Sequence, residues 1–424
     1  MLNNISRLCS KWLNPTLLPA GPLSGLDSML AAMDSHPNIE IRVFNPFTLR
    51  YMRGLEMLFS FTRINRRMHN KSITADNLVT IVGGRNIGDE YYDINKNVNF
   101  SDLDVITFGP VVDDVSTAFD KYWNYKSSIP VAALTAKAST DQLKYLRNAL
   151  NFFDESMQKS EYVQAVREST FLQNLTNQNL PFSWGKAYAI YDEPEKANPN
   201  IHDYQSYLTS KAKPHLFDTQ SELILISPYY IPREQRMTKF KELTVRGVRV
   251  RILTNSLAST DVSIVYAGYK PYRIPLLRAG IELYESMPTN NVSKQQKKHS
   301  FGGSSRASLH TKLYILDRKK IFVGSYNFDP RSLNINTELG ILFENKELAE
   351  EIAQWWDNHV DSWAYKLNLV EEESMEENDE SEYGIEWITT ENGKEQRYTV
   401  EPHTSFWRRF GVDFMSILPI EDQL

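Results

Sequence analysis

Short apolar runs alternate with polar, helix-like segments through the second half of the chain. Residues 223–227, 248–254, 281–284, 309–316, 321–323 and 339–343 are runs of branched or bulky apolar residues between Gly, Pro or polar turns, so each predicts a strand. The stretches between the first three runs have a helical pattern, and residues 347–365 predict an amphipathic helix. This alternation predicts an α/β fold, with helices on the faces of a mixed, mostly parallel sheet.

The first half repeats only part of this pattern. Residues 25–33 correspond to the helix that ends at Gly280, residues 39–44 to the strand at 281–284, and residues 79–82 and 103–107 to the later strands. Nothing before Gly25 corresponds to the strands at 223–227 and 248–254. The first half is therefore expected to lack a strand, a helix and a further strand. Either the N-terminal 23 or so residues form a substitute arm, or the chain is truncated.

These patterns divide the chain into four regions. Residues 1–132 form a first lobe that is short at its N-terminus, and residues 133–180 form a polar, helical linker. Residues 181–366 form a second lobe, which opens with the apolar stretch 182–192. Residues 367–424 are expected to be an acidic loop and a C-terminal tail.

Composition and charge narrow the class of protein. With 41% hydrophobic and 24% charged residues, the chain resembles an ordinary globular protein. The net charge is −6, but residues 371–382 hold eight carboxylates and no base, so the remainder carries about +2 (−6 + 8). The acidic run predicts a solvated loop, and the nearly neutral remainder argues against a general nucleic-acid binder. One cysteine, Cys9, excludes an intramolecular disulfide and a cysteine-based zinc site, and no apolar run reaches the eighteen or so residues of a membrane-spanning helix.

Two strings of one type carry the clearest chemical signal. They are His69-x-Lys71-x-x-x-x-Asp76 and His310-x-Lys312-x-x-x-x-Asp317, and each is followed by a small-residue turn that ends in Asn, Gly83-Gly84-Arg85-Asn86 and Gly324-Ser325-Tyr326-Asn327. The offset is 241 at the histidines (310 − 69) and again at the asparagines (327 − 86). A repeat that keeps its register over the whole block predicts two equivalent lobes around one site.

His and Lys two residues apart on a strand point to the same face, so each lobe presents an imidazole beside an ammonium. The following turn adds backbone N–H groups and an amide, which suits the oxygens of a phosphodiester. We therefore expect phosphate-binding roles for the turn residues Gly84, Asn86, Ser325 and Asn327. A lysine beside each histidine would repel a cation, so no metal is expected at these histidines.

Two facing histidines fit the two roles that phosphodiester chemistry needs. One attacks phosphorus and forms a phosphohistidine, while the other protonates the leaving alkoxide and then deprotonates the acceptor. Asp102 and Glu338 follow their histidines by 33 and 28 residues on comparable strands, so we assign them the role of orienting the imidazoles. On spacing alone, Asp76 and Asp317 are expected to brace the local loops.

The segments around these motifs resemble the phospholipase D superfamily, in particular the C-type class of bacterial cardiolipin synthases. They are NRRMHNKSITADNLVTIVGGRNIGDEYYD, NFSDLDVITFGPVV, RGVRVRILTNSLASTDVSIVYAGYKPYR and HTKLYILDRKKIFVGSYNFDPRS. The resemblance implies two phospholipase D-like lobes with the active site at their interface, and it extends the catalytic set to the whole of both motifs, Asp76 and Asp317 included. It also implies His69 as the nucleophile and His310 as the acid/base, an order that the residues alone leave open.

The resemblance implies a phosphatidyltransferase that needs no cofactor and makes cardiolipin from phosphatidylglycerol and a second phospholipid, with phosphatidylethanolamine as the candidate. Lipid substrates are also favoured by the aromatic loops of the second lobe and by the tail at 406–420, where Trp and Phe lie beside Arg as in an interfacial segment. The tail could equally pack on its own domain. The expected location is the surface of a bacterial inner membrane, without a nucleic-acid partner, and an accessory protein is left open. Two alternatives remain: a phospholipase D-like phosphodiesterase or nuclease, and an inactive truncated fragment.

Overall fold

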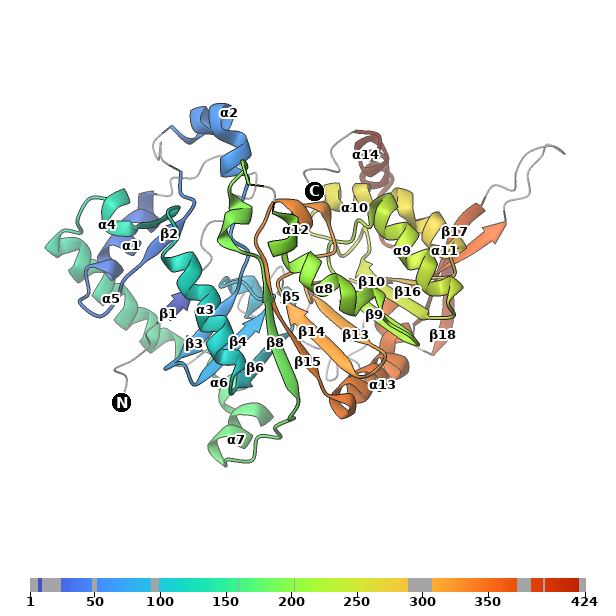
Figure 1. Cartoon of the computed structure of the whole chain (residues 1–424), viewed down its shortest axis with the longest axis horizontal. Coiled ribbons are helices and arrows are strands. Elements are labelled where there is room, and N and C mark those ends of the chain that lie inside the picture. Colours follow the sequence, from blue (N-terminus) through green and yellow to red (C-terminus); the bar gives the residue numbers. More distant parts are fainter. Residues whose placement is uncertain are drawn as a thin grey trace.

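The computed structural model describes residues 7–9, 24–47, 52–92, 99–158, 160–201, 203–288, 307–371, 383–391 and 393–418. Two α/β lobes lie side by side (Figure 1). The first lobe contains the elements from β1 to α4, and the second contains those from β8 to α14. The predicted acidic loop at 371–382 falls almost wholly outside the described residues, as does most of the N-terminal arm.

A ten-stranded sheet forms the centre of the second lobe. In spatial order its strands are β18 (Lys394–Tyr398), β17 (Tyr383–Glu391), β16 (Ala364–Glu371), β11 (Glu282–Ser286), β10 (Arg249–Asn255), β9 (Glu222–Ile226), β13 (Leu313–Leu316), β14 (Lys320–Gly324), β15 (Leu339–Glu344) and β8 (Lys186–Tyr191). The strands predicted from apolar runs are present within a few residues of their expected bounds. Strands β16, β17 and β18 were not predicted, because we expected only a loop and a tail after residue 366.

The sheet is mixed, as expected, but the prediction that it is mostly parallel was wrong. Only β9–β10 and β10–β11 pair in parallel, and every other neighbouring pair in this sheet is antiparallel. The reason lies in the connections. A helical crossover joins each parallel pair, whereas short turns join β13 to β14 and β17 to β18 and give antiparallel hairpins.

Helices cover both faces of this sheet. On one face lie α8 (Leu208–Phe217), α9 (Arg233–Val245), α10 (Ser263–Tyr269) and α11 (Arg273–Arg278), whose apolar side chains join one large core. On the other face lies α13 (Lys346–Trp363), the predicted amphipathic helix. Its buried residues Ala349, Ala353, Trp356 and Val360 recur at helical spacing and pack on alternate residues of β9, β13 and β14.

The first lobe contains a smaller version of the same arrangement. Its elements are β1 (Arg7–Cys9), α1 (Ser24–Asp34), β2 (Arg42–Phe44), α2 (Arg53–Ile64), β3 (Ser72–Ala75), β4 (Val79–Gly83), β5 (Asn99–Ser101), β6 (Asp104–Phe108), α3 (Val111–Trp123), β7 (Ser128–Pro130) and α4 (Val131–Leu134). Strands β1, β3, β4 and β6 form one antiparallel sheet, and β2 pairs with β7 in a separate two-stranded sheet.

Strand β1 occupies the place that β9 has in the second lobe. Cys9 pairs with Ser72 in an antiparallel ladder, as Ile226 pairs with Leu313, and Ser72 and Leu313 are equivalent positions of the repeat. Among the described residues no first-lobe strand corresponds to β10. The gap explains why β2 and β7, which pair as β11 and β16 do, stand apart from the other four strands.

The chain segment that connects the first lobe to the second in the sequence is helical. It contains α5 (Thr140–Met157), α6 (Glu161–Arg167) and α7 (Thr170–Thr176). Two short helices complete the second lobe: α12 (Pro330–Asn334) follows the second motif, and α14 (Phe406–Ser416) lies in the C-terminal tail. An apolar cluster joins the lobes, because Val82, Val111 and Val115 of the first pack against Leu339 and Ile341 of the second. The two halves of the site are therefore held together by a shared core.

Candidate active site

The His69 imidazole reaches across the lobe interface. Its Nδ1 atom lies 2.7 Å from Oε2 of Glu338, a carboxylate of the second lobe that is fully buried. The backbone crosses at the same point, since the His69 amide donates to the Thr337 carbonyl at 2.8 Å. The residue before the histidine and the residue before the carboxylate form a parallel bridge, Met68 with Thr337.

The second histidine repeats this geometry in the opposite direction. Nδ1 of His310 lies 2.6 Å from Oδ2 of Asp102, a buried carboxylate of the first lobe. The His310 amide donates to the Ser101 carbonyl at 2.8 Å. Each imidazole is thus oriented by the acid of the other lobe, and neither half of the site is complete by itself.

The strand predicted at 309–316 is interrupted to make this crossing. Strand β12 (Ala307–Leu309) leaves the second lobe and pairs in parallel with β5 of the first lobe, and β13 begins only at Leu313. His310 and Lys312 therefore stand in a short extended segment between two sheets. His69 and Lys71 likewise precede β3, which begins at Ser72.

Both lysines of the motifs are buried beside their histidines. The Lys71 ammonium donates to the His69 carbonyl at 2.9 Å, and that of Lys312 donates to the His310 carbonyl. Nζ of Lys312 also lies 2.9 Å from Nδ1 of His310. We assign the Nδ1 proton to the bond with Asp102, which is shorter and links the ring to a carboxylate. In each ring Nε2 is then the nitrogen left to react, with a lone pair when the imidazole is neutral and a proton to donate when it is charged.

Burial changes the pKa values of the charged groups. It raises the pKa of Asp102 to about 6, although the charge of Lys312 opposes the shift. Burial also raises the pKa of Glu338, against the charges of Lys71 and Lys196 and the hydrogen bond from Ser325. The pKa of Lys312 falls to about 8, first because the ammonium is buried, while Asp102 attracts it and Lys71 repels it. Two ammonium and two carboxylate groups therefore act on one another as a single cluster.

The turn residues that we predicted to bind phosphate have contacts of their own. The Ser325 hydroxyl donates to Glu338, and Gly84 lies so close to the Asp102 carboxylate that an added Cβ would come within 2.4 Å of it. Ser325 thus holds Glu338 in place, and the missing side chain at Gly84 makes room for Asp102. The Asn86 amide donates to the Tyr91 hydroxyl at 2.6 Å. Asn327 is buried, and its side-chain oxygen has no partner among the residues that the structure describes.

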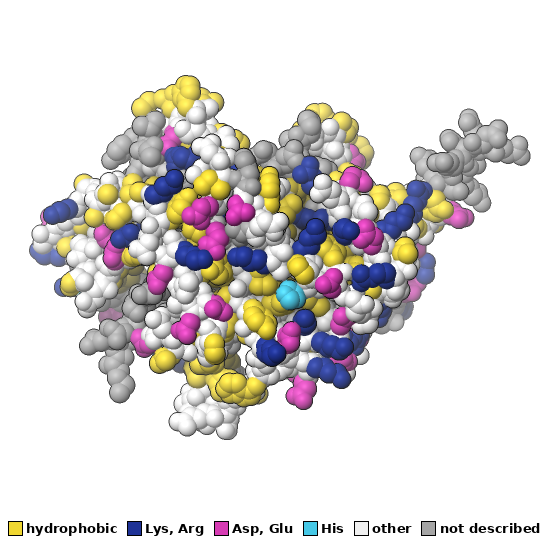
Figure 2. Space-filling model, viewed as in Figure 1, with side chains coloured by type: hydrophobic (Ala, Val, Ile, Leu, Met, Phe, Trp, Pro, Cys, Tyr) yellow, Lys and Arg dark blue, Asp and Glu magenta, His cyan; other side chains and the backbone are white. Residues whose placement is uncertain are grey.

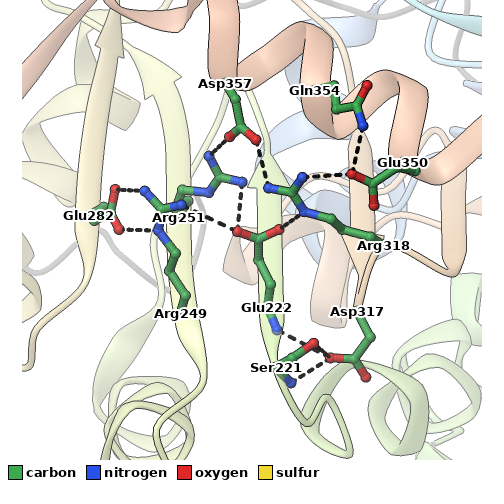
Figure 3. Close-up of polar contacts among 10 residues, drawn as sticks. All are labelled: Ser221, Glu222, Arg249, Arg251, Glu282, Asp317, Arg318, Glu350, Gln354 and Asp357. Atoms are coloured by element: carbon green, nitrogen blue, oxygen red, sulfur yellow. Dashed lines mark hydrogen bonds and ion pairs between the residues drawn. The ribbon is translucent and has the colours of Figure 1, made fainter.

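The two aspartates of the motifs are not brought to the histidines. Asp76 and Asp317 lie at the far ends of β3 and β13, each with a positive φ. Asp317 accepts hydrogen bonds from the backbone amides of residues 220–222 and from the Ser221 hydroxyl (Figure 3). It thereby ties the β13–β14 turn to the start of β9. Next to it Glu222 forms ion pairs with Arg251 and Arg318. These contacts hold β9, β10 and the β13–β14 turn together, so their role is structural.

Three aromatic residues that we did not predict surround His310. Its ring lies 5.1 Å from that of Tyr91, 5.4 Å from that of Phe100 and 6.4 Å from that of Tyr229, measured between centroids. The Tyr229 hydroxyl is held by the Asp261 carboxylate at 2.9 Å. The Pro-Tyr-Tyr turn after β9 was a visible signal for Tyr229, whereas nothing in the repeat pointed to Tyr91 or Phe100.

A buried acid behind Glu338 was also missed. Asp192 accepts from the Glu338 amide at 2.7 Å and from the Lys196 ammonium at 2.9 Å. Asp192 directly follows strand β8, and an acid at the end of an apolar run with a lysine four residues later was the available signal. Because Asp192 accepts from the backbone amide of Glu338, it helps to fix the position of this orienting acid.

The pKa values of Asp102 and Lys312 predict that activity has an optimum pH. They assign the loss of activity at high pH to Lys312. Below about pH 6, Asp102 gains a proton and loses the charge that holds the imidazole. Above about pH 8, Lys312 loses the charge that attracts phosphate. We therefore expect kcat/KM to be highest between these values. Lys312→Arg should remove the alkaline fall, because a guanidinium stays protonated there. Lys320→Arg, at a partly exposed lysine of β14, is the matched control. An alkaline limb that is unchanged in Lys312→Arg would contradict the assignment to Lys312.

The comparisons with known proteins show what the chain is similar to. Residues 215–360 match the family model described as "Cardiolipin synthase, PLD-like domain". The chain is 39% identical over 416 residues to cardiolipin synthase C of Escherichia coli (strain K12), an alignment that covers 96% of this chain and 83% of that protein. It is 32% identical over 409 residues to an uncharacterized protein of Helicobacter pylori (strain ATCC 700392 / 26695), covering 93% of this chain and 76% of that protein. Among solved structures, phosphatidylserine synthase of Haemophilus influenzae Rd KW20 matches with a TM-score of 0.47 and 13% identity, over 71% of this chain and 63% of that one.

The second lobe is thus a phospholipase D-like domain, and its histidine motif has a partner in the first lobe. The chain belongs to the family of cardiolipin synthases, phosphatidyltransferases of the phospholipase D type. Within the described residues, no helix is long and apolar enough to cross a membrane.

Proposed function

We propose that the chain makes cardiolipin at a bilayer surface from phosphatidylglycerol and a second phospholipid, with phosphatidylethanolamine as the candidate, through a phosphohistidine. The observation that carries the proposal is the crossed pair of hydrogen bonds, His69 to Glu338 and His310 to Asp102. This geometry supplies two imidazoles whose Nδ1 protons are held by carboxylates, so both Nε2 atoms are prepared for chemistry at one phosphodiester.

In the first step the Nε2 lone pair of His69 forms a bond to phosphorus, and the bond from phosphorus to the headgroup oxygen breaks. His310, protonated at Nε2, gives its proton to the leaving alkoxide, so the headgroup departs as a neutral alcohol. His310 then takes the proton of the acceptor hydroxyl, whose oxygen attacks phosphorus and breaks the phosphorus–nitrogen bond. Lys71 and Lys312 neutralise the charge on the phosphoryl oxygens in both steps. The assignment of His69 as nucleophile rests on the family resemblance.

Transfer to a lipid alcohol must compete with transfer to water. His310 is buried and lies among the rings of Tyr91, Phe100 and Tyr229, which limits the access of water to the base of the second step. This wall supports an alcohol acceptor over hydrolysis.

The direct test is turnover by the purified full chain on vesicles of phosphatidylglycerol alone, phosphatidylethanolamine alone, and a mixture of the two. With isotope-labelled headgroups, we expect cardiolipin and free ethanolamine from the mixture if phosphatidylethanolamine is the phosphatidyl donor. Cardiolipin with free glycerol from phosphatidylglycerol alone would make that lipid both donor and acceptor. Phosphatidic acid without cardiolipin would replace the transferase by the hydrolase alternative, and no turnover of any lipid would contradict the proposal.

A further inference from the structure

Helix α2 turns apolar side chains toward solvent and a charged pair toward the protein, the reverse of an ordinary surface helix. Its carboxylate Glu56 is only 3% exposed and pairs with Arg63 against the protein, while Leu58 is 79% and Phe59 83% exposed. Arg63 also donates to the Asn45 side chain at 2.7 Å, which fixes the charged face inward. Surface helices of globular proteins place their apolar stripe toward the core and their charges toward water. An apolar outer face of this size marks an interaction site.

Helix α14 has a similar outer face. Phe406, Phe410 and Phe414 recur every four residues and are all exposed, and Trp407 beside them is 76% exposed. On the opposite face Val412 is buried against the protein, and on the flank of the helix Asp413 forms an ion pair with Lys270. The docking surface, as we define it, consists of the exposed apolar residues of both helices: Leu55, Leu58, Phe59 and Phe61 of α2, and Phe406, Trp407, Phe410 and Phe414 of α14.

The two helices belong to different lobes but stand at the same end of the molecule (Figure 1). In the space-filling view, apolar side chains cap both of these projections, one above each lobe (Figure 2). The helices stand apart as two separate ridges. A flat, continuous apolar phase can contact both at once, whereas a single protein partner would need a surface shaped to both.

Each helix is also connected directly to one half of the active site. Helix α2 ends at Ile64, and the chain reaches His69 five residues later. On α14, Arg408 donates to the Thr260 carbonyl at 3.1 Å, and the next residue, Asp261, holds the hydroxyl of Tyr229 beside His310. Both helices of the docking surface are therefore linked to the active site, α2 through the chain before His69 and α14 through the contact of Arg408 with Thr260.

We propose that α2 and α14 dock the protein on a phospholipid bilayer, with both apolar faces embedded at the level of the headgroups and the active site held between them. This inference rests on the proposed function, because it is the lipid substrates that make a bilayer the occupant. Aromatic side chains such as Phe and Trp are well suited to this interface. The chain has a net charge of −6, so adhesion to an anionic bilayer comes from the apolar contact and persists at high salt.

The test uses single environment-sensitive probes on the full chain. The chain has one cysteine, so Cys9→Ser gives a background for Leu58→Cys, Phe414→Cys and, as a matched control, Leu78→Cys. Leu78 is 71% exposed and lies in the β3–β4 turn, at the far end of β3 from His69. On addition of phosphatidylglycerol–phosphatidylethanolamine vesicles, a dye at Leu58 or Phe414 should shift to the blue, and a dye at Leu78 should not. No shift at either helix would overturn the proposal.

Vesicle flotation gives an independent measurement. We expect Leu58→Ser/Phe59→Ser and Phe410→Ser/Phe414→Ser each to weaken vesicle binding by at least about tenfold, at low and at high salt. Unchanged melting temperatures would show that both variants remain folded. A blue shift that depends on protein concentration without vesicles would instead make the surface a contact between copies of the chain and overturn the bilayer assignment. All binding is measured in the His69→Ala background, so its outcome does not depend on whether cardiolipin is made.

Discussion

Alanine at His69 or at His310 is expected to reduce phosphatidyl transfer by about 10³-fold or more. In the proposed mechanism each imidazole has a separate role, nucleophile or acid/base, and each is held by an acid of the opposite lobe at 2.7 or 2.6 Å, so neither can replace the other. The measurement is the initial rate of cardiolipin formation on mixed vesicles. The double variant should be no slower than the slower single variant, because removal of either step already stops turnover.

A donor lipid with a p-nitrophenyl headgroup separates the two roles, since p-nitrophenolate leaves without a proton. His310→Ala should then still release a burst of p-nitrophenolate and accumulate a labelled His69, whereas His69→Ala should release none. The opposite pattern would reverse the assignment of nucleophile and acid. His359→Ala, on α13 and outside both motifs, is the matched control. More than a tenth of normal transfer in either single variant would contradict a two-histidine mechanism.

The repeat made the reactive groups predictable, but the way they meet depends on packing between distant segments. The offset of 241 singled out His69 and His310, and comparable places 33 and 28 residues later singled out Asp102 and Glu338, whose carboxylates lie beside the imidazoles. The sequence could not reveal that each acid serves the other lobe's histidine. That exchange depends on β12 pairing with β5 and on the bridge between Met68 and Thr337, which are contacts that no local pattern encodes.

The same limit explains the errors about the fold. Apolar runs located the strands β9, β10 and β11 well, because they are buried on both faces and read as continuous apolar segments. These three strands are parallel, but the strands added on either side of them pair antiparallel, and there the mostly parallel expectation failed. Strands β16 and β17 are only partly buried at the edge of the sheet, so their polar residues hid them beside the acidic run.

Removal of the Asp192 carboxylate is expected to destabilise the fold by about 3–5 kcal/mol, the usual effect of leaving one partner of a buried ion pair alone. Asp192 and Lys196 are both fully buried and lie 2.9 Å apart, and Asp192 also accepts from the amides of Leu208 and Glu338. Asp192→Ala would leave an ammonium without its counter-charge. The measurement is the free energy of unfolding in urea. Glu242→Ala, at an exposed pair with Lys239, should cost under about 1 kcal/mol.

The double variant Asp192→Ala/Lys196→Met distinguishes stability from support of the site. Replacing both charges by apolar groups removes the lone ammonium, so we expect it to recover about 1–3 kcal/mol relative to Asp192→Ala. Transfer should nevertheless remain low, because the Glu338 amide still lacks the acceptor that fixes this residue beside His69. If activity returned together with stability, Asp192 would be a structural residue alone. If neither returned, the buried ammonium would not be the cause of the instability.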